Sequence, residues 1–170
     1  MKRQKTVIIK FLFAAILIMS SLGNANAQDN ATITIGNQNW MVKNLDVSTY
    51  RNGDSIPQVQ DSTDWANLKT GAWCYYDNDP ANGAIYGKLY NWYAVNDPRG
   101  LAPEGWKVPT DAEWTILEIY LANNGYSGME ATALKSMTGW NPNGNGTDNY
   151  DSTALPGGYR GYSYGNYKDI

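Results

Sequence analysis

Beyond residue 27 the chain has few of the side chains that usually build an apolar core. Its aromatic residues there are 7 tryptophans and 13 tyrosines, because both phenylalanines, Phe11 and Phe13, come earlier. Only 20 residues beyond that point are isoleucine, leucine or valine. Each tryptophan or tyrosine can bury about 150 to 250 Å², but its polar atom needs a hydrogen-bond partner when buried. We therefore predict an aromatic, irregular core in a loop-rich α+β domain, which disfavours a helical bundle or a parallel-sheet α/β enzyme.

The first 27 residues have the pattern of a secretory signal peptide. Three basic residues, Lys2, Arg3 and Lys5, precede an uncharged stretch at 11–22, and residues 25–27 form a small-x-small cleavage site. The uncharged stretch is shorter than the roughly 20 residues that a membrane-spanning helix requires. We predict cleavage after residue 27, with an uncleaved anchor as the alternative. The mature chain, residues 28–170, is then a single secreted or extracytoplasmic domain without a transmembrane segment, located in the periplasm or at the cell surface.

Charge and composition exclude several functions. The leader holds four basic residues and no acid, so the net charge of −3 becomes −7 without it, which disfavours a nucleic-acid partner. The chain has no histidine and one cysteine, Cys74, which excludes histidine-dependent triads, a Cys/His zinc cage and an internal disulfide. In an exported chain, Cys74 is either a small buried hydrophobe or the partner of a cysteine on sequence that this chain lacks.

The clearest local signal predicts a helix that begins after Thr110. Thr110 and Glu113 have the spacing of a capping box, in which each side chain bonds the other's backbone N–H. Trp114, Leu117 and Leu121 then follow at helical spacing, and residues 123–125 end the helix.

Turn residues and apolar spacing predict the remaining elements. The strands are expected in a hairpin at 31–47 with its turn at 36–39, at 72–76, in extended structure at 154–160, and at 161–167 without a partner. The helices are expected over two turns after the caps at 61–64 and ending at Gly71, at 89–95, where a strand is the alternative, and at 129–137. Residues 51–54, 77–83 and 141–149 are expected to form turns and polar loops.

Several separated motifs resemble the Fibrobacter succinogenes major paralogous domain and cover nearly all of residues 33–160. They are the segments 36–45, 70–76, 86–95, 105–114 and 154–160. The resemblance implies a secreted or surface-located bacterial domain whose activity is generally unassigned. The helix start at 108–114 and the Pro-Gly-Gly-Tyr-Arg segment are also similar to sulfatase-modifying-factor domains, which implies a C-type-lectin-like fold with short helices and small antiparallel sheets.

Two departures from these relatives limit what the resemblance implies. Family members usually continue through a Trp-rich strand to a closing strand that carries a cysteine, so we expect the domain to be truncated at its C-terminus. That truncation would account for an unpaired Cys74. The sulfatase-modifying oxidase uses a pair of cysteines near its C-terminus, and since this chain has no such pair, its chemistry is not carried over.

A tryptophan followed by an amide-rich loop is the candidate ligand-binding region. Aromatic faces and amide groups together suit a glycan or a protein surface. The candidate contacts are Trp140, Asn141, Asn143, Asp148 and Tyr150, with the terminal tyrosines as a further possibility. The residues expected to be structural are Thr110, Glu113, Trp114 and Cys74.

Metal and sugar motifs are weak in this sequence. Asp77, Asp79 and Asn82 have oxygens that suit calcium, but the spacing fails the EF-hand register, so a structural turn is favoured. Residues 141–143 are similar to a sugar-binding calcium motif of C-type lectins, but asparagine replaces the acid that would hold the cation. We predict no metal and no cofactor.

Catalytic patterns are equally weak. Trp106, Glu113 and Trp114 could form a sugar-stacking pair beside an acid, but the capping box and the buried stripe account for the last two. Paired carboxylates, Asp77 with Asp79 or Glu104 with Glu113, would need to face each other about 5 to 9.5 Å apart in a glycosidase, which sequence does not reveal. We expect a non-catalytic surface module that binds a polysaccharide. The alternatives are an adhesive protein that binds another protein, and a carboxylate-based glycoside hydrolase.

Overall fold

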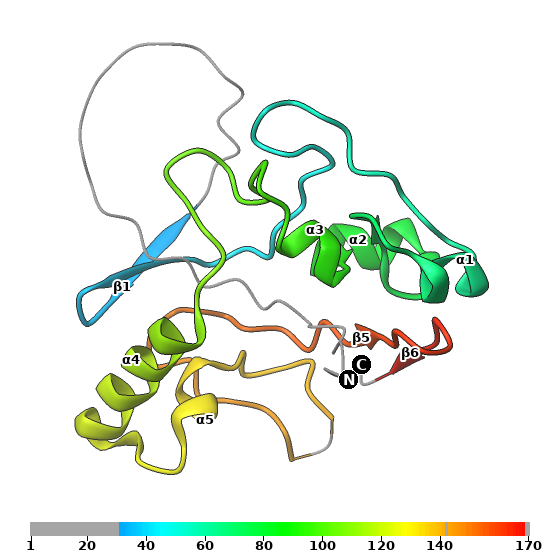
Figure 1. Ribbon diagram of the computed structural model, residues 1–170. Coiled ribbons are helices and arrows are strands. Elements are labelled where there is room, and N and C mark those ends of the chain that lie inside the picture. Colours follow the sequence, from blue (N-terminus) through cyan, green and yellow to red (C-terminus); the bar gives the residue numbers. More distant parts are fainter. Residues whose placement is uncertain (1–30, 142, 169–170) are drawn as a thin grey trace. The chain divides into compact units, whose positions relative to one another are not determined.

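A computed structural model describes residues 31–141 and 143–168 (Figure 1). The expected signal peptide, residues 1–27, lies outside the described residues. The described chain is a mixed α/β structure with short helices and three two-stranded antiparallel sheets. This confirms the expected combination of short helices with small antiparallel sheets.

The elements are short and separated by long irregular segments. The strands are β1 Thr32–Ile35, β2 Gln38–Met41, β3 Trp73–Cys74, β4 Leu89–Tyr90, β5 Tyr159–Arg160 and β6 Tyr167–Lys168. The helices are α1 Ser62–Asn67, the 3₁₀ turn η1 Tyr76–Asn78, α2 Pro80–Tyr86, α3 Trp92–Val95, α4 Asp111–Leu121, the π-helical turn η2 Ala122–Tyr126 and α5 Glu130–Leu134. The strands pair as β1 with β2, β3 with β4 and β5 with β6.

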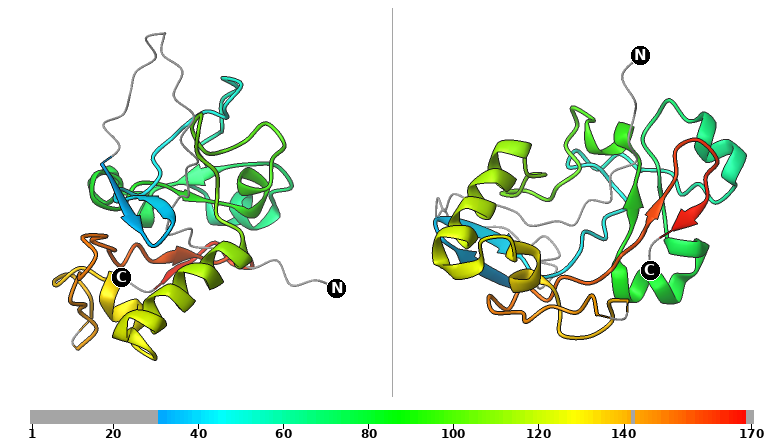
Figure 2. Two further views of the ribbon diagram at one scale, coloured as in Figure 1. Left: turned by 90° about the vertical axis from the view of Figure 1, so that its left-hand side faces the viewer. Right: turned by 90° about the horizontal axis from the view of Figure 1, so that it is seen from below.

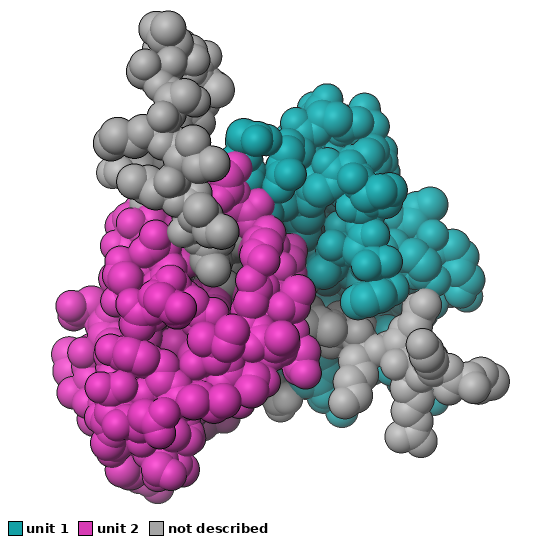
Figure 3. All heavy atoms as spheres, turned by 60° about the vertical axis from the view of Figure 1, so that its left-hand side comes forward, with its two compact units in different colours: residues 1–10, 44–104, 155–170 teal, residues 11–43, 105–154 magenta. Residues whose placement is uncertain are grey.

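The chain divides into two compact units, coloured separately in Figure 3. Within the described residues, unit 1 comprises 44–104 and 155–168, and unit 2 comprises 31–43 and 105–154. Each unit therefore combines two stretches that are far apart in the sequence.

In unit 2 the predicted hairpin is present. Strands β1 and β2 pair with Thr32 opposite Met41 and Ile35 opposite Gln38, so the turn is shorter than expected and Gln38 already belongs to β2. Gly36 adopts a φ of 63° in this turn, and the ring of Tyr120 lies so close that a Cβ there would come within 2.8 Å of it. Glycine is needed at this position for both reasons.

The predicted helix α4 begins with the expected capping box. The Glu113 carboxylate accepts the backbone N–H of Thr110 at 2.9 Å, and the Thr110 hydroxyl accepts the N–H of Glu113 at 3.3 Å. Leu117 and Leu121 are buried on one side of α4. The helix lies beside the β1–β2 hairpin (Figure 2). The buried core of unit 2 is completed by Ile35, Trp40, Ala133 and Leu134. Trp114 packs against this core, with its ring 5.4 Å from that of Trp40.

In unit 1 a buried arginine organises the aromatic core. Arg160 is 1% exposed and donates to the carbonyl oxygens of Val59 at 2.7 Å, Gln60 at 2.6 Å and Gly165 at 2.9 Å. Its guanidinium group lies 4.6 Å from the ring centre of Trp65 and 4.9 Å from that of Tyr167. The arginine of the Pro-Gly-Gly-Tyr-Arg segment therefore joins the β5–β6 hairpin to the segment before α1.

Three sequence predictions in unit 1 are wrong in part. Residues 77–83 are not only a loop, because Asp79 accepts the N–H of Ala81 and caps helix α2. Residues 89–95 contain both alternatives, strand β4 and then helix α3, which Asn91 caps by accepting the N–H of Ala94. Residues 161–167 are mainly a turn that leads into β6, and β6 pairs with β5, so this segment has the strand partner that we did not expect.

Two predicted helices end early. Helix α1 stops at Leu68, which is extended, rather than at Gly71. Helix α5 stops at Leu134 because Lys135 is extended and bridges Ala154 in parallel. No side chain caps α5 at its start, in agreement with its weak sequence signal.

We expect Thr110→Ala to lower the free energy of unfolding by about 1 kcal/mol, because the N–H of Glu113 loses its capping acceptor. Urea denaturation measures the effect. Thr115→Ala is the control, since Thr115 is exposed within α4 and alanine has the higher helix propensity. Equal losses in the two variants would contradict a capping role for Thr110.

We expect Arg160→Lys to lower the free energy of unfolding by about 2 to 4 kcal/mol, because a single ammonium group cannot serve three carbonyl oxygens in the plane of a guanidinium fork. Arg51→Lys is the matched control. Arg51 also donates to a carbonyl oxygen, that of Ala102, but it is exposed, so a loss below about 1 kcal/mol is expected. Similar losses of unfolding free energy in both variants would show that the burial of Arg160 adds nothing to the stability of the protein.

Candidate functional site

Trp140, the first predicted contact, is anchored within unit 2. It is half-buried, and its indole N–H donates to the carbonyl oxygen of Ala154 at 2.9 Å and to the hydroxyl of Ser136 at 3.2 Å. The ammonium group of Lys135 lies 4.3 Å from the ring centre. The polar atom of Trp140 thus holds the start of the loop in place, and one of its ring faces is already covered by a cation.

The polar residues of the predicted loop divide into two kinds. Asn141 and Asn143 are exposed, and Asn143 has a φ of 69°. Both carboxylate oxygens of Asp148 are engaged within the loop, since they accept the N–H of Thr153 at 2.8 Å and its hydroxyl at 3.0 Å. Asp148 therefore closes the turn at 148–153, whereas the side chains of Asn141 and Asn143 are exposed to solvent.

Tyr150 is the predicted residue that the structure brings together with other aromatic side chains. Its ring lies 6.4 Å from that of Tyr120 and 5.8 Å from that of Tyr126, edge to face in both cases. These three residues, which we call the tyrosine cluster, come from α4, η2 and the loop after Asp148. All three rings pack against the core of unit 2 and are partly exposed.

The hydroxyl groups of the tyrosine cluster are available to a ligand. None of the three hydroxyls makes a hydrogen bond within the described part of the chain. Burial raises the pKa of Tyr150, and the neighbouring phenols of Tyr120 and Tyr126 raise this pKa further, so the Tyr150 phenol remains protonated at neutral pH. A tyrosine hydroxyl can donate one hydrogen bond and accept others. The cluster therefore presents apolar ring surface together with hydroxyls that both donate and accept.

Sequence reasoning did not select Tyr120 or Tyr126. Tyr120 lies at the border of the buried stripe of α4, one residue before the buried Leu121. Tyr126 follows the glycine that ends the helix, within a segment that looks like a simple stop signal. Periodicity could have flagged Tyr120, whereas no local pattern points to Tyr126.

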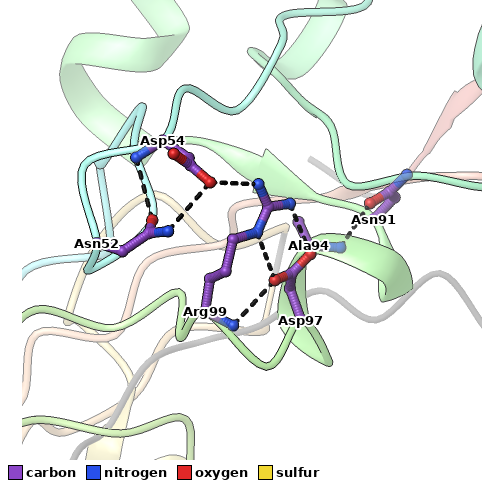
Figure 4. A network of polar contacts seen from close by, with 6 residues as sticks. All are labelled: Asn52, Asp54, Asn91, Ala94, Asp97 and Arg99. Carbon is purple, nitrogen blue, oxygen red and sulfur yellow. Dashed lines mark hydrogen bonds and ion pairs between the residues drawn. The ribbon is translucent and has the colours of Figure 1, made fainter.

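A polar network in unit 1 has structural rather than binding geometry (Figure 4). The guanidinium group of Arg99 donates to both carboxylate oxygens of Asp97 at 2.8 and 2.9 Å and to Asp54 at 2.9 Å. Asn52 also donates to Asp54, at 3.0 Å. The hydrogen bond from Arg99 lowers the pKa of Asp97 to about 2. Because the donors of Arg99 already face two acids, this network ties the turn at 52–54 to the turn after α3.

The remaining predicted carboxylates also serve local structure. Asp79 caps α2, and the Asn82 amide donates to the carbonyl oxygen of Tyr76 at 3.2 Å, as expected for a structural turn. Glu113 forms an ion pair with Lys107 in addition to its capping role. Among the described residues, no group of three or more histidine, cysteine, aspartate or glutamate side chains could hold a metal ion.

Cys74 is free and completely buried in the core of unit 1. Burial raises the pKa of its thiol, against the opposing influence of Arg160. Cys74 thus contributes to the core beside Trp65 and Ala72 as a small apolar side chain.

These observations define a small mixed α/β domain with an irregular aromatic interior and a cluster of tyrosines on unit 2. The chain belongs to the Fibrobacter succinogenes major domain family, whose family model matches residues 33–169. This confirms the family that the sequence motifs indicated. No curated protein and no solved structure matches the chain. In the part that the structure describes, no helix is both long and apolar enough to cross a membrane.

We expect Asp97→Asn to destabilise the protein at neutral pH and to lose this effect in acid. The pKa of Asp97 in the folded state, about 2, lies below its ordinary value of 3.8. Its ion pair with Arg99 therefore stabilises the fold at pH values above 3.8, and this stabilisation is lost as the pH falls through the folded-state pKa. Urea denaturation of both proteins from pH 7 to pH 2 measures the difference. Asp151→Asn, at an exposed position, is the control, and a difference for Asp97→Asn that stays constant with pH would contradict the ion pair.

Proposed function

We propose that this protein is an exported, non-catalytic module that binds a glycan through the tyrosine cluster. The leader-like residues 1–27 support export, and the similarity of the segments at 108–114 and 154–160 to sulfatase-modifying-factor domains supports a C-type-lectin-like fold. The observation that carries the proposal is the convergence of Tyr120, Tyr126 and Tyr150. Their hydroxyls have no partner within the described chain.

The chemistry of the cluster suits a sugar. Pyranose rings have C–H faces that pack on aromatic rings, and their hydroxyl groups donate and accept hydrogen bonds as phenols do. Tyrosine side chains lose little conformational entropy on binding, and here packing against the core already restricts the rings. A glycan could therefore bind without a large rearrangement of the protein.

A non-catalytic role agrees with the positions of the acids that sequence analysis considered. Glu113 is held by the backbone of Thr110 and by Lys107, and Asp79 is held at the start of α2. A glycosidase would need an acid and a base or nucleophile placed on either side of the scissile bond. The three tyrosines supply binding groups but no carboxylate pair.

We expect Tyr126→Phe and Tyr150→Phe each to weaken glycan binding by about threefold to tenfold, the effect of one lost hydrogen bond. Neither variant should lose stability, because neither hydroxyl bonds the described protein. A glycan array identifies the ligand, and titration calorimetry with that ligand gives the dissociation constants. Tyr164→Phe is the matched control, since Tyr164 is 79% exposed in the β5–β6 turn of unit 1.

Three results would overturn this function. Binding that is lost in Tyr164→Phe and retained in the cluster variants would move the site to the terminal tyrosines. Silence on the array together with capture of a purified surface protein would favour the adhesive alternative, and turnover of a polysaccharide would establish the hydrolase.

A further inference from the structure

The tyrosine cluster lies in a unit with an excess of negative charge. The described residues of unit 2 include three lysines and six acidic residues. Two of the lysines are already engaged, Lys107 with the Glu113 carboxylate and Lys135 with the Trp140 ring and the Gly144 carbonyl oxygen. A ligand of this unit therefore meets few available cations.

The three segments that form the cluster also have more acidic than basic residues. Helix α4 and η2 contain no lysine or arginine between Asp111 and Tyr126. On the third segment, Asp148 and Asp151 lie on either side of Tyr150 in the sequence. Proteins usually hold carboxylates, sulfates and phosphates with arginine or lysine donors, which this surface does not supply.

Exposed apolar side chains continue from the cluster along α4. Ile116 is 48% exposed and precedes Tyr120 by one helical turn, and Ile119 is 55% exposed. Both side chains point out of the core, in contrast to Leu117 and Leu121. The contact surface is therefore longer than a single ring and offers further apolar contact to the C–H faces of a sugar chain.

We propose that the tyrosine cluster binds an uncharged glycan chain and excludes glycans that carry carboxylate or sulfate groups. This inference rests on the proposed function and adds the class of ligand. Phenolic hydroxyls satisfy the hydroxyls of a neutral sugar without any cation. For an anionic chain, the nearby acids add repulsion, and the segments that form the cluster contain no lysine or arginine to offset it.

The test compares binding of the full mature chain to two sets of polysaccharides at low and high salt. The uncharged set is cellulose, mannan and unsubstituted xylan, and the anionic set is alginate, polygalacturonate and chondroitin sulfate. We expect binding to at least one uncharged polymer, with a dissociation constant that changes less than twofold between about 20 and 500 mM salt, because screening does not affect contacts between neutral groups. Binding to an anionic polymer that weakens as salt increases would overturn the inference.

A pair of variants at Ile116 tests the electrostatic argument separately. Ile116→Lys places a cation one turn from Tyr120, and Ile116→Gln has a similar size without the charge. We expect Ile116→Lys, but not Ile116→Gln, to gain salt-sensitive binding to an anionic polymer. Anionic binding that is equal in both variants would contradict exclusion by charge.

The outcomes distinguish a wrong ligand class from a wrong glycan-binding function. If Tyr126→Phe and Tyr150→Phe weaken binding to an anionic polymer, the cluster is a glycan site and only the ligand class is wrong. If neither set of polymers binds, or if binding is unaffected in both cluster variants, the proposed function itself fails.

Discussion

The constraint on which this structure depends is that an interior of tryptophan and tyrosine must find partners for its own polar atoms. The indole N–H of Trp73 donates to the carbonyl oxygen of Ile56 at 2.8 Å, and the hydroxyl of Tyr90 donates to that of Val47 at 2.7 Å. Both acceptors lie in segments without helix or strand. Because the rings bond these irregular segments directly, long stretches of loop are held in place with little regular structure.

The same aromatic interior accommodates buried cations. Lys88 has a side chain only 5% exposed, and its ammonium group bonds Asp46 at 2.5 Å while it lies 4.6 Å from the ring centre of Trp73. The guanidinium group of Arg160 likewise lies over the rings of Trp65 and Tyr167. The negative face of an aromatic ring stabilises a cation that an aliphatic core would exclude. The shortage of aliphatic residues and the presence of buried lysine and arginine therefore have a single physical explanation.

Sequence reasoning succeeded where several local signals agreed and failed where tertiary contacts selected the residue. Helix α4 was predictable because its cap, apolar stripe and stop all lie within its own segment. Helix α2 was missed because Gly83 gives it the composition of a loop. A Cβ at Gly83 would lie 2.2 Å from the ring of Tyr75, so packing against that ring, rather than a turn, requires the glycine. Such a requirement is not visible in the helix's own sequence.

The candidate site contains one residue that the local sequence indicated and two that only tertiary contacts bring to it. Tyr150 was selected because it follows an amide-rich loop, yet its neighbours Tyr120 and Tyr126 join it only through the fold. Trp140 was expected to contact a ligand. Its indole N–H is instead hydrogen-bonded within the protein, to Ser136 and Ala154, as the polar atoms of the interior rings are. One exception within the interior is Trp40, whose indole N–H has no acceptor among the described residues. The three phenols differ from Trp40 because they are partly exposed, so a ligand from solvent can supply the hydrogen bonds that the described chain does not.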